Sequence, residues 1–198
     1  MLMNGFGRTR FLRFRPALTM VVLAMFWTTA YADEARVVYY DVVGNSATTL
    51  RDAMDRQGPL DRAGKRFDGH TTWQLKWSYR YAPVGSECKF TSMSTSLEAT
   101  IVLPRWVHDE RASRSLIKKW DSYVVALRGH EDGHYAHGLA AEKELDALGQ
   151  SFRVAGACST IAKAFNDQAS AIVARYQALD VTYDRDTDHG KNQGATFP

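Results

Sequence analysis

Hydrophobic patterning marks three strand-like segments in the first half of the chain. Residues 36–43 are rich in β-branched and aromatic side chains, and residues 70–81 and 87–103 alternate between apolar and polar positions. Both patterns are typical of strands. Pro104 is expected to end the third strand, because proline has no backbone N–H to donate. Two or three of these strands are predicted to be antiparallel.

A short helix is predicted between the first two strands. Ser46 or Asn45 can cap its first turn, and a Gly-Pro pair follows its last residue, Gln57. A capping side chain accepts a hydrogen bond from a free N–H of the first turn, whereas Gly-Pro does not continue a helix. Residues 60–69 are polar and predict a loop.

A longer apolar stripe follows the strands, over residues 112–150. Its members recur every three or four residues, which is the period of one helix face. They are Leu116, Trp120, Tyr123, Leu127, His130, His134, His137, Ala141, Leu145 and Leu148. Gly129 and Gly133 weaken such a helix by up to about 1 kcal/mol each. One continuous helix and a break near Arg128-Gly129 both fit the pattern.

A last helix is predicted after Gly156, with Ser159 as its cap and a stripe that fades near Val181. The stripe consists of Ile161, Phe165, Ile172, Tyr176 and Leu179. Residues 183–198 are polar and Gly-rich, with no hydrophobic reason to be ordered. The predicted fold class is α+β, a small antiparallel or mixed sheet followed by a long helix and a C-terminal helix.

The motif H-E-x-x-H lies within the long stripe, at His130, Glu131 and His134. Side chains four residues apart on a helix lie about 5–6 Å apart at Cβ, so both imidazoles can bind one metal ion. A catalytic zinc site has three protein ligands and a water molecule, and Glu131 is placed to accept a proton from that water. Buried histidines with ordinary hydrogen bonds are the alternative interpretation.

Other polar residues near the motif are weaker candidates. His137 is seven residues past His130, about 10.5 Å along the helix, and is interpreted as packing or as support for the ligands. Glu142 and Glu144 are about 12 Å or more beyond the second histidine. Asp167 lies about 120° from the apolar stripe of its helix and is expected to face water.

The third ligand is predicted to be His189, which lies in the polar tail beside a glycine that lets the backbone approach closely. Asp184, Asp186 and Asp188 are alternative oxygen donors from the same segment. A solvated tail with an incidental histidine is the simpler alternative. Tyr183 is either a transition-state donor or the last packed residue of its helix.

The first 32 residues have the pattern of a secretory signal peptide. Four arginines precede an eleven-residue apolar run, and an A-x-A cleavage site ends at Ala32. The run is short for a permanent membrane span. Cleavage would leave residues 33–198, the size of one domain, in a periplasmic or secreted protein without a stable membrane anchor.

Removal of the signal peptide changes the net charge. The chain has 25 Lys and Arg and 22 Asp and Glu residues, and four of the arginines are in the signal. Residues 33–198 therefore carry 21 minus 22, or −1. This charge gives no basis for nucleic-acid binding.

Cys88 and Cys158 are the two cysteines of the chain. In an oxidising compartment such a pair favours a disulfide. Zinc binding by thiolates is the alternative, although neither cysteine has a C-x-x-C partner.

Several segments together resemble a known family. They are VVYYDVVGNSATTLRDAM, the W-x-x-x-W of Trp73 and Trp77, Cys88, HEDGH and YDRDTDHGKNQGATFP. These segments are similar to bacterial proteins described as predicted secreted zinc-dependent proteases, a largely uncharacterised group placed with the zincin peptidases. The resemblance covers nearly all of residues 33–198.

The resemblance implies a zincin-like fold, with the H-E-x-x-H helix packed beneath a sheet. It implies zinc binding by His130 and His134 and a catalytic role for Glu131, and it draws attention to Thr187, His189 and Gly190. The chain departs from the elongated metzincin motif, because His137 and Ala140 stand where that motif has glycine and histidine.

The sequence therefore favours a zinc metallopeptidase that acts on a peptide or protein substrate. Zinc held by His130, His134 and His189 would polarise a peptide carbonyl, and Glu131 would act as general base. The alternatives are a non-catalytic envelope protein, with a structural metal or a partner-binding role, and a zinc amidase that acts on cell-wall peptides.

Overall fold

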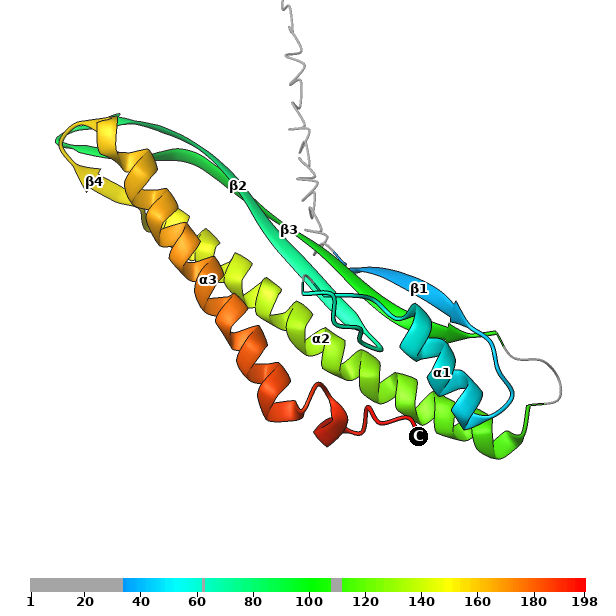
Figure 1. Cartoon of the computed structure of the whole chain (residues 1–198). Helices are drawn as coiled ribbons and strands as arrows, with labels where there is room; N and C mark the ends of the chain where they lie inside the picture. Colours follow the sequence, from blue (N-terminus) through cyan, green and yellow to red (C-terminus); the bar gives the residue numbers. More distant parts are fainter. Residues whose placement is uncertain (1–33, 62, 108–111) are drawn as a thin grey trace, which may run out of the picture. The chain divides into compact units, whose positions relative to one another are not determined.

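The computed structural model describes residues 34–61, 63–107 and 112–198, and the predicted signal peptide lies outside the described residues. The elements are β1 (Arg36–Val42), α1 (Ala47–Gln57), β2 (His70–Val84), β3 (Glu87–Trp106), α2 (Arg114–Ser151), β4 (Arg153–Ala155), η1 (Cys158–Thr160), α3 (Ile161–Thr187) and η2 (Lys191–Gln193) (Figure 1). Within the described residues, no helix is both long enough and apolar enough to cross a membrane.

Four strands form one mixed sheet in the spatial order β1-β3-β2, with β4 paired to the start of β3. β2 and β3 form a long antiparallel hairpin. β1 instead runs parallel to β3, from the pair Arg36–Thr100 to the pair Val42–Trp106. The sheet is therefore mixed, which is the second of the two predicted arrangements, and β1 is not one of the antiparallel strands. The chain between the parallel strands β1 and β3 contains α1, the loop after it and β2, and is therefore long enough for the connection that parallel strands require.

Of two local predictions, the cap of α1 is correct and the end of the third strand at Pro104 is not. The cap of α1 is confirmed, because the Ser46 hydroxyl accepts a hydrogen bond from the N–H of Thr49 and the Thr49 side chain accepts one from the N–H of Ser46. Pro104 does not end the third strand, which continues to Trp106. β2 pairs with β3 only as far as Val102, so β3 has a single neighbour at Pro104 and tolerates the missing N–H.

Two long helices lie along one side of the sheet (Figure 1). α2 is one unbroken helix of 38 residues, so the possible break near Gly129 does not occur. α3 lies beside α2 and continues to Thr187, past the predicted end near Val181. Ser159 does not cap α3, because it lies within η1, the 3₁₀ turn that precedes the helix.

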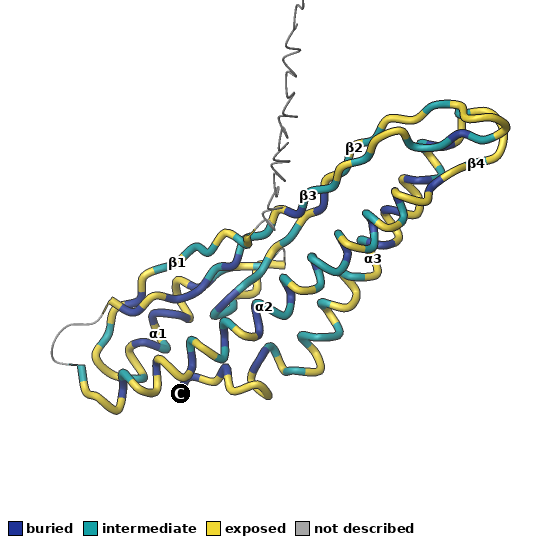
Figure 2. The backbone as a smooth tube through the Cα atoms, turned by 180° about the vertical axis from the view of Figure 1, so that it is seen from behind, coloured by how far each residue is buried: buried dark blue, intermediate teal, exposed yellow. Residues whose placement is uncertain are grey.

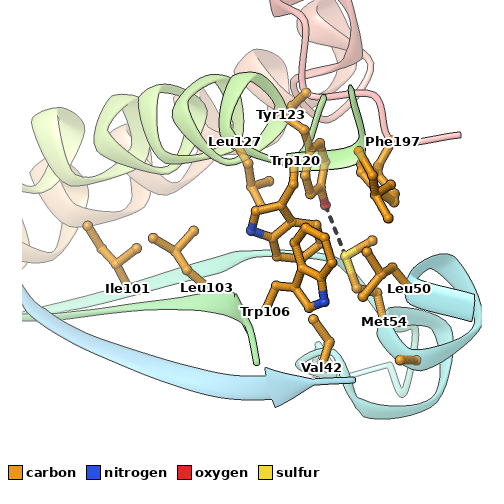
Figure 3. Close-up of a cluster of buried hydrophobic side chains, with 13 residues drawn as sticks. Val42, Leu50, Met54, Ile101, Leu103, Trp106, Trp120, Tyr123, Leu127 and Phe197 are labelled. Atoms are coloured by element: carbon orange, nitrogen blue, oxygen red, sulfur yellow. Dashed lines mark hydrogen bonds between the residues drawn. The ribbon is translucent and has the colours of Figure 1, made fainter. Parts of the chain in front are cut away.

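Buried residues recur along the strands and along α2 and α3 (Figure 2). The buried apolar side chains among them form two clusters. The first cluster joins α1, the ends of β1 and β3, the first half of α2 and the C-terminal residues (Figure 3). The second joins the β2–β3 hairpin, the second half of α2 and α3. On α2, the H-E-x-x-H motif comes after the residues of the first cluster and before those of the second.

The C-terminal residues are anchored in the first cluster. Ala195 and Phe197 are buried, and the Phe197 ring packs edge-on against Trp120 with 5.3 Å between ring centroids (Figure 3). The expectation that the tail has no hydrophobic reason to be ordered is therefore wrong. Two apolar residues after a polar run, Ala195 and Phe197, tie it to the core.

The predicted disulfide between Cys88 and Cys158 is confirmed. It joins the start of β3 to η1 and closes a loop of 70 residues. Asp167 is also where the sequence placed it, exposed on α3 and paired with Lys163.

Candidate metal centre

The inner stripe of α3 does not end at Val181 but becomes polar. Asp180, Tyr183, Asp184 and Thr187 lie four, seven, eight and eleven residues after Tyr176, which keeps them on one helix face. Their side chains contact the histidines of α2. α3 therefore extends past the apolar stripe because its polar face packs against the polar part of α2.

Two histidines and one carboxylate converge on the same place. The Nε2 atoms of His130 and His134 each lie 3.1 Å from Oδ1 of Asp184. The donor atoms of these three residues all lie within 4.8 Å of one another, and both histidines are buried. Imidazole nitrogens and a carboxylate oxygen are ligands that Zn²⁺ and several other divalent metals accept.

The remaining ring nitrogens are held by oxygen atoms. Nδ1 of His130 lies 3.0 Å from Oε1 of Gln193, and Nδ1 of His134 lies 3.0 Å from Oδ1 of Asp180. Since an amide oxygen or a carboxylate can only accept, both partners suit a ring whose hydrogen is on Nδ1, which is the tautomer that leaves Nε2 free to bind a metal ion. Metal-binding histidines are commonly supported in this way, so the donor set fits a metal ion.

The charges of the cluster also suit a cation. Burial raises the pKa of Asp184, but hydrogen bonds from His130 and His134 outweigh it and hold the pKa well below the usual range. Burial lowers the pKa of His134, but hydrogen bonds to Asp180 and Asp184 outweigh it and raise the pKa to about 9. The metal-free cluster thus holds a proton on His134 between two carboxylates, and a metal ion would replace that proton.

His137 contacts Asp180, the carboxylate that also holds His134. Its Nδ1 lies 2.7 Å from Oδ1 of Asp180, the oxygen that Nδ1 of His134 also contacts, and the indole N–H of Trp73 donates to the other oxygen of Asp180 at 2.8 Å. His134, His137 and Asp180 form a second group that could hold a metal ion. Its ligand from His134 would have to be Nδ1, which conflicts with binding through Nε2.

Glu131 is buried beside the two histidines and faces the start of β2. The hydroxyl of Thr71 lies 2.8 Å from Oε2 of Glu131, and a Cβ atom added to Gly69 would lie 2.7 Å from Oε1. Burial raises the pKa of Glu131, and the hydrogen bond from Thr71 opposes that rise. A carboxylate in this setting can exchange a proton closer to neutral pH than an exposed one.

The site opens into a cavity of about 530 Å³. Its walls come from α1, the loop before β2, α2, α3 and the C-terminal segment. The lining includes Phe67, His70, His130, Glu131, His134 and Asp184. The candidate ligands and the candidate base therefore face a space that could admit part of a substrate.

His189 lies at the edge of the site. Its Nδ1 is 3.3 Å from Oδ1 of Asp184, and its ring packs against Phe67 with 5.2 Å between centroids. It is not a member of the group formed by His130, His134 and Asp184. Its assignment as the third ligand stays a prediction, and Asp184, which the sequence offered only as an alternative, occupies the place beside both histidines.

The other residues of the predicted tail segment have different surroundings. Tyr183 stacks on the His130 ring with 4.9 Å between centroids and 12° between planes, and its hydroxyl hydrogen-bonds Gln193. It is therefore a packed residue of α3. Asp186 and Asp188 form exposed ion pairs with Arg185 and Lys191.

Sequence reasoning missed Asp180 and Gln193. Asp180 carries a signal, because it continues the helical spacing of the α3 stripe and precedes Asp184 by four residues. The sequence gives no signal that Gln193 belongs to the site, since its position depends on how the chain turns after α3.

Comparison with known proteins gives one match. Residues 37–190 match a family described as bacterial protein of unknown function, DUF922. The matched range contains the H-E-x-x-H motif, Asp184 and His189 but ends before Gln193. Comparisons with curated proteins and with solved structures gave no match.

Proposed function

Because the chain belongs to this family of bacterial proteins of unknown function, its activity has to be argued from the site, and we propose that it is a zinc-dependent peptidase that acts outside the cytoplasm. One observation carries the proposal. The Nε2 atoms of His130 and His134 converge on one oxygen of Asp184, and the buried carboxylate of Glu131 lines the same cavity. Two histidines and a carboxylate are a donor set of catalytic zinc sites.

We assign His130, His134 and Asp184 as the ligands. Zinc bound there would polarise a substrate carbonyl and lower the pKa of a bound water molecule towards about 7. Three protein ligands leave one position of a tetrahedral site for water or substrate. A fourth protein ligand from His189 would close that position, so we place His189 as a neighbour of Asp184.

Glu131 is the general base of the proposed reaction. Its carboxylate accepts a proton from the attacking water and then passes it to the leaving amine. Burial is the largest influence on its pKa and raises it, whereas the hydrogen bond from Thr71 and the charges of His134 and His130 lower it. This balance keeps the carboxylate able both to accept and to release a proton near neutral pH.

A peptide substrate is supported by the sheet next to the site. Among the described strands, β2 pairs with β3 alone, so the other side of β2 has free backbone groups. β2 begins at His70, and Thr71 contacts Glu131. An extended peptide could pair with this free side and reach the cavity. Action outside the cytoplasm is supported by the disulfide and the predicted signal peptide.

The test is Glu131→Gln in the full-length protein, measured for zinc content and for cleavage of fluorescein-labelled casein. We expect the variant to keep one zinc per chain and to lose cleavage by about 10²-fold or more. Glu98→Gln is the control, because Glu98 is exposed on β3 and pairs with Lys76. Cleavage by the zinc-bound Glu131→Gln protein at the wild-type rate would contradict the proposal.

One observation favours a non-catalytic alternative. The contact of His189 with Asp184 places a fourth metal-binding side chain beside the cluster, and structural zinc sites have four protein ligands. Such a protein would bind zinc and show no hydrolysis that depends on Glu131. A zinc amidase would use the same site, so the same variants assayed on cell-wall peptides would identify it.

A further inference from the structure

The C-terminal segment after α3 contacts His130 at Nδ1, whereas Asp184 contacts the same ring at Nε2. Oε1 of Gln193 lies 3.0 Å from Nδ1 of His130. We infer that Gln193 is a positioning residue that orients His130 for metal binding. This inference rests on the proposed metal site and deepens it. Gln193 lies outside the part of the chain that matches the family.

The chain turns sharply to bring Gln193 to this place. Asp188 and His189 have φ angles of 48° and 50°, and Gly190 has a φ of 81°. Left-handed conformations are unfavourable for non-glycine residues, so contacts elsewhere must hold the turn. The Thr187 hydroxyl accepts a hydrogen bond from the N–H of Gly190 at 3.2 Å, and backbone hydrogen bonds join Gly190 to Gln193 and Ala195.

The turn packs directly on the His130 ring. A Cβ atom added to Gly190 would lie 2.9 Å from Cγ of His130, so only glycine fits without displacement. Beyond Gln193, buried Ala195 and Phe197 tie the segment to the first hydrophobic cluster (Figure 3). The aromatic core therefore fixes the position of Gln193 along the segment.

The Gln193 side chain contacts both His130 and Tyr183, and the Tyr183 hydroxyl lies near both atoms of the amide, 3.3 Å from Oε1. Nε2 of Gln193 donates to the hydroxyl of Tyr183 at 3.0 Å, and its Oε1 faces Nδ1 of His130. Tyr183 in turn stacks on the His130 ring. With Oε1 as acceptor, the hydrogen of a neutral His130 sits on Nδ1 and the lone pair of Nε2 points at the metal site.

The contact to Gln193 corresponds to the contact of Asp180 with His134. One histidine has a carboxylate partner and the other has a neutral amide partner. A carboxylate makes an imidazole more basic than an amide does, so Gln193→Glu should preserve or strengthen metal binding through His130. Gln193→Met has a side chain of similar length whose sulfur is only a weak acceptor, and it should weaken that binding.

The experiment measures Zn²⁺ affinity by competition with a chromophoric chelator, in the full-length wild type and in Gln193→Met, Gln193→Glu and Asn192→Ala. Asn192 is the matched control, because it lies in the same turn and its amide donates to the backbone oxygen of Asp186. We expect Gln193→Met to weaken Zn²⁺ binding about 10- to 100-fold, Gln193→Glu to bind at least as tightly as wild type, and Asn192→Ala to be unchanged.

A ¹⁵N NMR spectrum of the histidine side chains of the zinc-loaded protein supplies a second readout. We expect the wild type to show His130 with its hydrogen on Nδ1, and the hydrogen-bonded Nδ1–H signal to be lost in Gln193→Met. Wild-type affinity and an unchanged His130 signal in Gln193→Met would overturn the inference and leave the zinc site standing. A wild type that binds no zinc would instead refute the proposed function.

Discussion

Gly133 and Tyr183 touch so closely that a methyl group on Gly133 would lie 2.6 Å from Cζ of the tyrosine. Tyr183 stacks on His130, so this contact lets α3 approach the motif and support a candidate ligand. From helix propensity alone, Gly133 looks like a weakness of α2. In the folded protein, the absence of a side chain at Gly133 leaves room for Tyr183 of α3 to pack against α2.

Gly133→Ala and Gly129→Ala should therefore have opposite effects. A Cβ atom at Gly129 would meet no atom within 4 Å, so alanine there should stabilise the protein by up to about 1 kcal/mol. Alanine at Gly133 must displace Tyr183, and we expect it to destabilise the protein by about 1–3 kcal/mol and to weaken zinc binding. Urea unfolding and zinc titration check both. Two variants of equal stability would contradict the contact.

Thr71→Val should shift the pH dependence of hydrolysis. The Thr71 hydroxyl lies 2.8 Å from Oε2 of Glu131, and this hydrogen bond lowers a pKa that burial raises. Without this hydrogen bond the pKa of Glu131 should rise further. As the pH falls, the carboxylate should therefore become protonated, and stop acting as a base, at a higher pH than in the wild type. A hydrogen bond to a charged group contributes about 1.5–3 kcal/mol, or about 1–2 pH units. The acidic limb of the pH–rate profile should move up in Thr71→Val and stay in place in Thr71→Ser.

Zinc affinity should rise with pH between pH 6 and 8. In the metal-free protein burial lowers the pKa of His134, but hydrogen bonds to Asp180 and Asp184 outweigh it and raise the pKa to about 9. Zinc must displace that proton, so its affinity should increase about tenfold for each pH unit. Calorimetry in buffers of different ionisation enthalpy should report about one proton released at pH 7. An affinity that does not change with pH would argue against His134 as a ligand.

The same pKa shift predicts the stability of the metal-free protein. Because the folded pKa of His134 exceeds the value of about 6.5 for an unfolded histidine, its stabilising effect is fully present below pH 6.5 and is lost as the pH rises through about 9. The melting temperature should fall over this interval in the metal-free wild type. His134→Gln should show a smaller fall.

Removal of the disulfide should affect stability and leave the metal site intact. The bridge closes 70 residues, so replacing both Cys88 and Cys158 by serine should lower the free energy of unfolding by about 4 kcal/mol. The bridge joins the hairpin end of β3 to η1, where β4 also pairs, and α1 lies at the other end of the sheet (Figure 1). Denaturant unfolding should show the loss, and the zinc content of the folded variant should remain that of wild type.

The sequence predicts those parts of the fold that rest on local patterns. The stripe of α2, the cap of α1 and the hairpin strands follow from spacing and from single capping residues. The direction of β1 does not, because alternation marks a strand without stating its partner. The end of α3 was misplaced because Asp180 and Asp184 look like a solvent-facing surface until α2 is known to present histidines to them.

For the candidate site, too, the sequence predicts the residues that local spacing brings together and misses those that depend on tertiary packing. His130, Glu131 and His134 form a continuous motif, so spacing alone brings them together. Asp184 and Gln193 reach the histidines only through the packing of α3 and the turn after it. A two-residue apolar anchor, Ala195 and Phe197, fixes that turn, and a polar tail gives little sign of it.

The most direct measurement of the central claim is the zinc content of the full-length wild type, Asp184→Asn and His189→Gln, determined by mass spectrometry after zinc loading and removal of excess metal. His130, His134 and Asp184 as ligands predict one zinc per chain in wild type and in His189→Gln, and a loss of zinc in Asp184→Asn. Zinc retained in Asp184→Asn and lost in His189→Gln would contradict the assignment and return the third ligand to His189. A folded wild type without zinc would contradict the metal centre itself.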